Sequence, residues 1–224
     1  RVYKDAKKLP VVSYDEMMEL AFLGAGVMEP RAVELGSKYG VEIYVGKSLG
    51  EKNGTIITSR EKTKENKEME QKVITGVSIN ENMVMVNVEE IPTNAQNVYE
   101  IFKRAEANGI NIDIISQNDV TSHHGSFAFT CPKTDIAALE KIGAEIEAEF
   151  PRTSFIINPY ITKVSVVGIG LISNIGVAAK MFRILSENDI SFHQVSTSEI
   201  SISLVVDEVM GKRLAELFAK EFDL

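Results

Sequence analysis

The side chains best suited to binding a small charged molecule fall in two stretches of the chain. Asp113, Gln117 and Asn118 lie within the segment Gly109-Ile-Asn-Ile-Asp-Ile-Ile-Ser-Gln-Asn118, and residues 91–96 open a predicted helix. Helix-start amides bind carboxylates, Asp113 can pair with an ammonium group, and amide side chains both donate and accept hydrogen bonds. Together, these groups fit a small molecule that carries both a carboxylate and an ammonium group. From periodicity alone, however, the favoured interpretation of Asp113 is a solvated residue on the outer face of a strand.

Other chemistry-bearing residues favour structural roles. His123 and His124 are adjacent in a turn and point apart, no third ligand is near in sequence, and Cys131 lies across a strand, so we expect no metal site. The run Ser196-Thr-Ser-Glu199 has no histidine and acid arranged around a serine, which argues against a nucleophilic site. We expect it to satisfy backbone groups at a strand end or to contact another module.

The stretch around Asp113 belongs to an internal repeat. Residues 105–118 recur as residues 185–198, and the offset of 80 also relates Val84 to Val164 and Phe102 to Phe182. Five extra residues around His123-His124-Gly125 then reduce the offset to 75. His193 takes the position of Asp113, which predicts that the second copy has lost the binding site and that His193 is a strand residue at a subunit contact.

The pattern of each copy predicts the order β-α-β-β-α-β, which is the ferredoxin-like unit and an α+β fold. The elements expected in the first copy are strands at 84–88, 110–114, 126–130 and 154–157 and helices at 97–108 and 134–150. Those expected in the second copy are strands at 163–167, 191–196 and 201–206 and helices at 177–186 and 209–221. The second copy has no final strand, so its sheet must borrow one or stay short.

The residues before the repeats predict a small α/β region. Ser13 and Glu16 form a capping box, Pro30 suits a first helical turn, and Gly40 ends that helix before strands at 41–45 and 54–57. At about 58 residues this region is small for an independent domain, so we expect it to pack on something else. Residues 59–72 are more than half charged, which indicates a solvated linker or a short exposed helix.

Composition narrows the classes of function. The 224 residues are 44% hydrophobic and 25% charged, as in globular proteins. A net charge of −8 argues against a nucleic-acid partner, and the absence of a long apolar run argues against a membrane partner. One cysteine excludes an internal disulfide and suits the cytoplasm. The chain starts at Arg1 rather than Met, so we expect it to be part of a longer protein.

Several motifs resemble the aspartokinase family. Ser13-Tyr-Asp-Glu-Met17, Glu19-Leu-Ala21, Pro30-Arg31 and Gly54-Thr55 are similar to the closing segment of its amino-acid kinase domain. The tandem repeat, with Lys163-Val-Ser-Val-Val-Gly168 and Ser196-Thr-Ser-Glu-Ile-Ser201, resembles the paired ACT domains that follow. The implied domains are residues 1–58 (end of the kinase domain), 59–72 (linker), 73–158 (first ACT domain) and 159–224 (second ACT domain).

The resemblance implies feedback regulation. The parent enzyme would phosphorylate aspartate with ATP and magnesium, while this part would need no cofactor, would dimerise through its ACT domains, and would bind L-lysine or L-threonine. The implied effector site lies between residues 91–98 and the strand at 112–118, with Asp113 beside that loop. Its residues are Ile91, Thr93, Asn94, Asn97, Val98, Ile112, Asp113, Gln117 and Asn118. Arg1 would be the last trace of a nucleotide-side Asp-Pro-Arg motif.

Two departures from the family pattern matter. Glu29 stands where the family has histidine, and Thr93-Asn-Ala-Gln96 replaces an Asp-Lys-Pro-Gly turn. The missing aspartate at Thr93 favours lysine over threonine.

No Lys-Phe-Gly-Gly phosphate-binding segment occurs, so we expect this part alone to be inactive. The alternatives are a section of an intact catalytic polypeptide and a free-standing amino-acid sensor, against which the kinase-like residues 13–57 argue.

Overall fold

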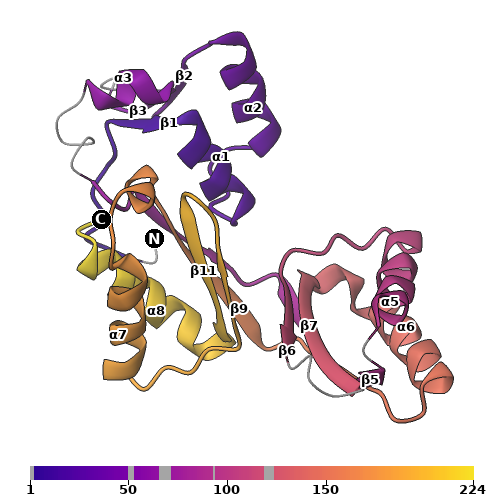
Figure 1. Cartoon of the computed structure of the whole chain (residues 1–224). Helices are drawn as coiled ribbons and strands as arrows, with labels where there is room; N and C mark the ends of the chain where they lie inside the picture. The colour runs from indigo at the N-terminus through magenta and orange to yellow at the C-terminus, as the bar shows by residue number, and fades with distance from the viewer. Residues whose placement is uncertain (1–2, 50–52, 66–71, 93, 119–123) are drawn as a thin grey trace. The chain divides into compact units, whose positions relative to one another are not determined.

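The computed structural model describes residues 3–49, 53–65, 72–92, 94–118 and 124–224 (Figure 1). The chain divides into two compact units, one of residues 81–162 and one that joins residues 1–80 to residues 163–224. Among the described residues, no helix combines the length and the apolar character that a membrane crossing requires.

The unit of residues 81–162 is the first copy of the repeat and has the predicted β-α-β-β-α-β order. Its sheet has the order β6-β7-β5-β8, and every neighbouring pair of strands is antiparallel. Its elements are β5 (Met83–Pro92), α5 (Ala95–Ala107), β6 (Ile115–Asn118), β7 (His124–Pro132), the 3-10 helix η1 (Lys133–Asp135), α6 (Ile136–Glu149) and β8 (Ser154–Asn158). The predicted ferredoxin-like fold is therefore confirmed for this copy.

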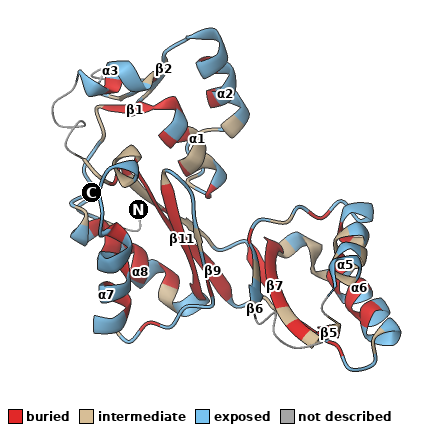
Figure 2. Ribbon diagram, in the orientation of Figure 1, coloured by how far each residue is buried: buried red, intermediate tan, exposed pale blue. Residues whose placement is uncertain are grey.

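The core of the first copy lies between this sheet and its two helices. The apolar stripe of α5 buries Ile101 and Ala105, and α6 buries Leu139 and Ile146. The opposite faces of both helices are exposed in Figure 2. Gly109, at φ 69°, ends α5 in a left-handed conformation that glycine adopts without steric cost.

The strand predicted at residues 110–114 was placed too early. β6 begins only at Ile115, although the amide of Asp113 donates to Thr130 O at 2.9 Å. Ile110 is buried and Ile112 packs on the same core. The alternating isoleucines therefore mark a connection that is anchored in the core, not a regular strand.

The second copy belongs to the other unit. Its elements are β9 (Ile161–Val167), the 3-10 helix η2 (Ile169–Ile172), α7 (Val177–Glu187), β10 (Gln194–Thr197), β11 (Ser201–Asp207) and α8 (Glu208–Glu221). All seven residues of β9 are buried, and Figure 2 shows β9 and β11 buried along most of their lengths. A core of Val164, Val166, Leu204, Leu214 and Phe218 joins the sheet to α7 and α8.

The second sheet borrows its fourth strand, which is one of the two outcomes that the sequence left open. Its order is β10-β11-β9-β4, where β4 is Gly76–Asn80. β4 runs antiparallel to β9 from Gly76 opposite Val167 to Asn80 opposite Lys163. The expected domain limits of 73–158 and 159–224 are wrong here, because β4 precedes the first copy in sequence but completes the sheet of the second.

The N-terminal α/β segment contains the elements expected from its pattern. These are β1 (Val11–Ser13), α1 (Tyr14–Phe22), α2 (Pro30–Tyr39), β2 (Ile43–Val45), β3 (Thr55–Thr58) and α3 (Arg60–Lys64). Its sheet has the order β1-β3-β2. The segment packs on the second copy through a shared core that includes Val12, Met17, Leu20 and Val167. The expectation that this region packs on another part of the protein is thus confirmed.

Candidate functional site

The connection from β5 to α5 holds the predicted helix-start site. Asn94 is the N-cap of α5, and its side-chain oxygen accepts from the Asn97 amide at 2.8 Å. The Asn97 side chain donates to Pro92 O at 2.9 Å. Because the first amides of a helix lack acceptors within it, those of the exposed Ala95 and Gln96 can still bind a carboxylate.

Apolar side chains anchor this connection on both sides. Ile91 is buried in the core of the first copy, and Val98 packs against that core. Both therefore position the loop and do not offer polar contacts to a ligand. Thr93 and Arg1 lie outside the described residues.

A β-bulge next to the connection was missed by the sequence analysis. The pairing of β5 with β7 shifts between Val88 and Ile91, and Glu90 adopts φ 57°. The Glu90 carboxylate lies 3.5 Å from the Arg152 guanidinium, and the Thr153 hydroxyl donates to Glu90 O at 3.3 Å. Bulges of this kind redirect a strand end beside functional sites. The only sequence signal was the pair Glu89-Glu90, which interrupts the alternation of β5.

Asp113 does not lie beside the connection in one chain. Its amide bonds to Thr130, whose hydroxyl lies 3.4 Å from the Asp113 carboxylate, whereas Ile91 at the loop pairs with Gly125. Five residues of β7 separate these levels, which at about 3.4 Å per residue is roughly 17 Å. The predicted proximity is therefore wrong within one chain, because β5 and β6 run parallel and Asp113 precedes β6.

Gln117 and Asn118 do lie at the same end of the sheet as the connection. In β6, Gln117 pairs with Phe127 and Asn118 with Ser126, while Pro92 at the end of β5 pairs with His124. β7 separates the two strands, and β6 forms the edge of the sheet. Gln117 is exposed at that edge, so its amide is available to a ligand or a second chain.

The second copy differs at the matching position. His193 donates its amide to Val205 O, as Asp113 does to Thr130 O. The His193 ring nitrogen Nε2 lies 2.7 Å from Asp207 Oδ1 of the same copy. His193 therefore has an acidic partner within its own chain.

The remaining polar motifs have structural roles. Ser198 Oγ accepts the amides of Ile200 at 3.3 Å and Ser201 at 3.0 Å, which confirms that this run satisfies backbone groups. No cluster of three histidine, cysteine, aspartate or glutamate side chains that could hold a metal ion exists within the described ranges. Burial raises the pKa of the Cys131 thiol to about 12, so this side chain stays a neutral part of the core.

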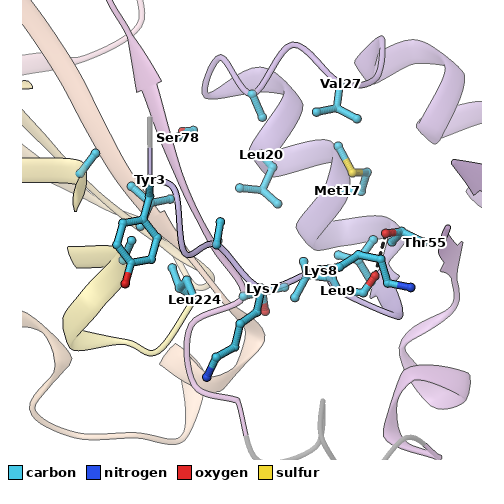
Figure 3. Close-up of a pocket in the computed structure, with 18 of the residues that line it drawn as sticks. Tyr3, Lys7, Lys8, Leu9, Met17, Leu20, Val27, Thr55, Ser78 and Leu224 are labelled. Carbon is cyan, nitrogen blue, oxygen red and sulfur yellow. Dashed lines mark hydrogen bonds between the residues drawn. The ribbon is translucent and has the colours of Figure 1, made fainter. Parts of the chain in front are cut away.

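One hollow in the unit that includes the second copy is lined mainly by apolar side chains. It has a volume of about 610 Å³ and is lined by residues such as Met17, Leu20 and Val27 (Figure 3). Figure 3 shows the amino groups of Lys7 and Lys8 directed away from that lining. The Thr55 hydroxyl donates to Leu9 O at 2.6 Å and is already used. Such a lining does not suit a molecule with two opposite charges.

Comparison with known proteins shows the family to which this chain belongs. A family model described as an ACT domain matches residues 164–222. A solved structure of aspartokinase alpha and beta subunits is 32% identical, with a TM-score of 0.62, and the match covers 67% of this chain and 99% of that chain. The chain belongs to the aspartokinase family.

Further relatives agree on the extent of the match. The aspartokinase of Bacillus sp. (strain MGA3) is 37% identical over 225 residues, which is 100% of this chain and 53% of the relative. The chain thus spans about half the length of the curated aspartokinases that it matches. Clostridium acetobutylicum aspartate kinase is 23% identical and has the same fold, with a TM-score of 0.85 over 99% of this chain and 50% of that one.

Proposed function

We propose that this ACT-containing regulatory part of an aspartokinase binds L-lysine as a feedback effector and forms a homodimer through its first copy. The parent enzyme would transfer a phosphoryl group from ATP to the side-chain carboxylate of L-aspartate. The observation that carries the proposal is the arrangement at the β5–α5 connection, which places helix-start amides and Gln117 at one end of a sheet with an open edge.

We assign no phosphoryl transfer to these residues by themselves. The sequence holds no Lys-Phe-Gly-Gly phosphate-binding segment, so we infer that the triphosphate and its magnesium would depend on other residues. The kinase domain of the same enzyme is accordingly the partner on which the regulatory part would act.

Pairing of two β6 strands would complete the effector site. A two-fold axis through the middle of β6 makes the two strands antiparallel. The Asp113 end of one copy then lies beside the Asn118 end of the other, where the β5–α5 connection begins. Helix-start amides from one chain would bind the effector carboxylate, and Asp113 of the second chain would bind an ammonium group.

Lysine suits this site better than threonine because its side chain carries a second ammonium group. Binding at 0.1 to 1 mM needs about 4 to 5.5 kcal/mol, which a few charge-assisted hydrogen bonds can provide. A coupling of about 1 to 3 kcal/mol to the kinase domain would be typical of feedback inhibition.

We expect Asp113→Asn to weaken lysine binding at least tenfold in calorimetric titration. The substitution removes the charge but keeps an oxygen for the Thr130 hydroxyl, and a hydrogen bond to a charged group is worth about 1.5 to 3 kcal/mol. His193→Asn is the matched control, because His193 takes the same position in the second copy, and it should leave lysine affinity unchanged. Equal affinities of the wild type and Asp113→Asn, or tighter binding of threonine than of lysine, would contradict the assignment.

We also expect Ile115→Lys to convert a dimer into a monomer in sedimentation experiments. Ile115 is 57% exposed on the edge strand β6, where a lysine opposes strand pairing. The control is Ile156→Lys, since Ile156 is 46% exposed on β8 at the other edge of the same sheet. Monomeric wild type at micromolar concentration, or dissociation caused equally by both variants, would rule out pairing through β6.

A further inference from the structure

The helix α1 of the N-terminal α/β segment carries a buried carboxylate that forms hydrogen bonds both within its own helix cap and with the second copy of the repeat. Glu16 is only 5% exposed. It accepts from the Ser13 hydroxyl at 2.6 Å and from the Ser13 amide at 3.4 Å, which completes the capping box of α1. These bonds account for a glutamate at position 16 as part of the helix cap. They use only some of its hydrogen-bonding capacity, because a carboxylate can accept about four hydrogen bonds.

The second oxygen of Glu16 binds the second copy of the repeat. Glu16 Oε1 accepts from the amide of Ile169 at 3.1 Å and from the hydroxyl of Thr75. Thr75 immediately precedes β4, and its amide donates to Val167 O at 2.7 Å. One carboxylate therefore joins α1 to both the entry of β4 and the exit of β9.

A second acid on the same face of α1 makes a parallel contact. Glu19 Oε1 accepts from the Ser201 hydroxyl at 2.6 Å, at the start of β11. Ser201 Oγ also lies 2.9 Å from Ser198 Oγ, in the turn before that strand. Glu16 and Glu19 thus hold two neighbouring connections of the second copy.

Glu16 holds the beginning of the connection that corresponds to the β5–α5 connection of the first copy. Ile169 matches Glu89, at the strand end before the helix-start amides of Ala95 and Gln96. By the offset of 80 residues, the β9–α7 connection at residues 168–176 corresponds to residues 88–96. A Cβ atom on Gly168 would come within 2.2 Å of Val73 O, and one on Gly170 within 2.4 Å of Val73 Cα. The beginning of this connection is therefore in backbone contact with the segment that leads into β4, and no ligand fits between them.

We propose that Glu16 is an internal ligand of the second copy, and that this copy uses the beginning of its β9–α7 connection to hold α1 of the N-terminal α/β segment and does not offer that connection to a free amino acid. The proposal rests on the proposed effector function only for the comparison with the first copy. The charge of Glu16 is well placed, because Arg60 and Lys72 line the same polar hollow of about 390 Å³. Glu16 is thus a positioning residue that links the second copy to the N-terminal α/β segment.

The test is hydrogen exchange of the Ile169 amide in the full chain, followed at single-residue resolution without any effector. Glu16→Ala removes the acceptor of this amide and should speed its exchange at least tenfold. Thr75→Val removes only the donor in the second copy, leaves the capping box intact, and should speed exchange of the Ile169 amide by severalfold. Ser13→Ala is the matched control, since it breaks the cap but not the link, and it should speed exchange in the first turn of α1 while Ile169 stays protected.

Calorimetry of the same proteins tests whether the second copy takes a free ligand. We expect one lysine per chain at saturation in the wild type and in Ser13→Ala. Wild-type protection of Ile169 in both Glu16→Ala and Thr75→Val would overturn the internal link. A second lysine per wild-type chain that His193→Asn abolishes would overturn the claim that the second copy is occupied from within. If the wild type bound no lysine at all, the effector proposal would fail, while the exchange result would still decide the role of Glu16.

Discussion

A fragment of residues 159–224 is expected to remain largely unfolded, although it contains the whole sequence of the second copy. The fragment lacks β4, which forms five register pairs with β9 from Gly76 to Asn80. It also lacks Ile74, which is 2% exposed in the core, and Val77 and Ile79, which pack against that core. Burying side chains of this size contributes about 1.5 to 3 kcal/mol each, so the loss is on the order of 5 kcal/mol. That is comparable to the stability of a domain of this size.

Adding residues 73–80 after Leu224 should restore folding of this fragment. The amino group of Lys72 lies 3.4 Å from Asp223 O, so the C-terminus is already beside the entry to β4 and a short glycine-serine linker suffices. Circular dichroism and urea titration would compare the two proteins, with a fusion that carries Val77→Asp as the control. A fragment of residues 81–162 should fold alone, because its four strands are contiguous in sequence. A cooperative transition of the 159–224 fragment equal to that of the fusion would contradict this prediction.

The second large effect is expected from Phe129→Ala, which should destabilise the first copy by about 3 to 5 kcal/mol. Phe129 is 1% exposed, and its ring centroid lies 5.6 Å from that of Phe102, 6.3 Å from Phe127 and 6.4 Å from Phe155. The substitution leaves a cavity among three rings that helices and strands hold in place, so the site cannot collapse to fill it. Urea unfolding of residues 81–162 measures the loss.

Tyr99→Ala is the matched control for this substitution. Tyr99 is an aromatic residue of the same copy, but it is 53% exposed on α5 and should cost less than about 1 kcal/mol. A loss below 1 kcal/mol for Phe129→Ala, or equal losses for the two variants, would show that this aromatic cluster does not carry the stability of the first copy.

The local elements of this protein follow from short-range patterns. The capping box of Ser13 and Glu16, the first turn at Pro30 and the helix ends at Gly40 and Gly109 all occur where the residue types predict them. These features depend on hydrogen bonds and backbone conformations within a few residues, so neighbouring residue types suffice to specify them. The order of elements in the repeat follows for the same reason, because each apolar period is local.

The pairing of distant segments was decided by tertiary structure. The five residues of β4 fit an edge strand of either copy, and only the gap beside β9 determines that they complete the second sheet. The alternation of apolar and polar residues around Asp113 also could not predict which end of the sheet Asp113 occupies, since that depends on the parallel course of β5 and β6. Nor could a capping box reveal that Glu16 also binds Thr75 and Ile169. In each case the partners lie far apart in the chain, and local propensity carries no information about which surfaces remain to be covered when the elements pack.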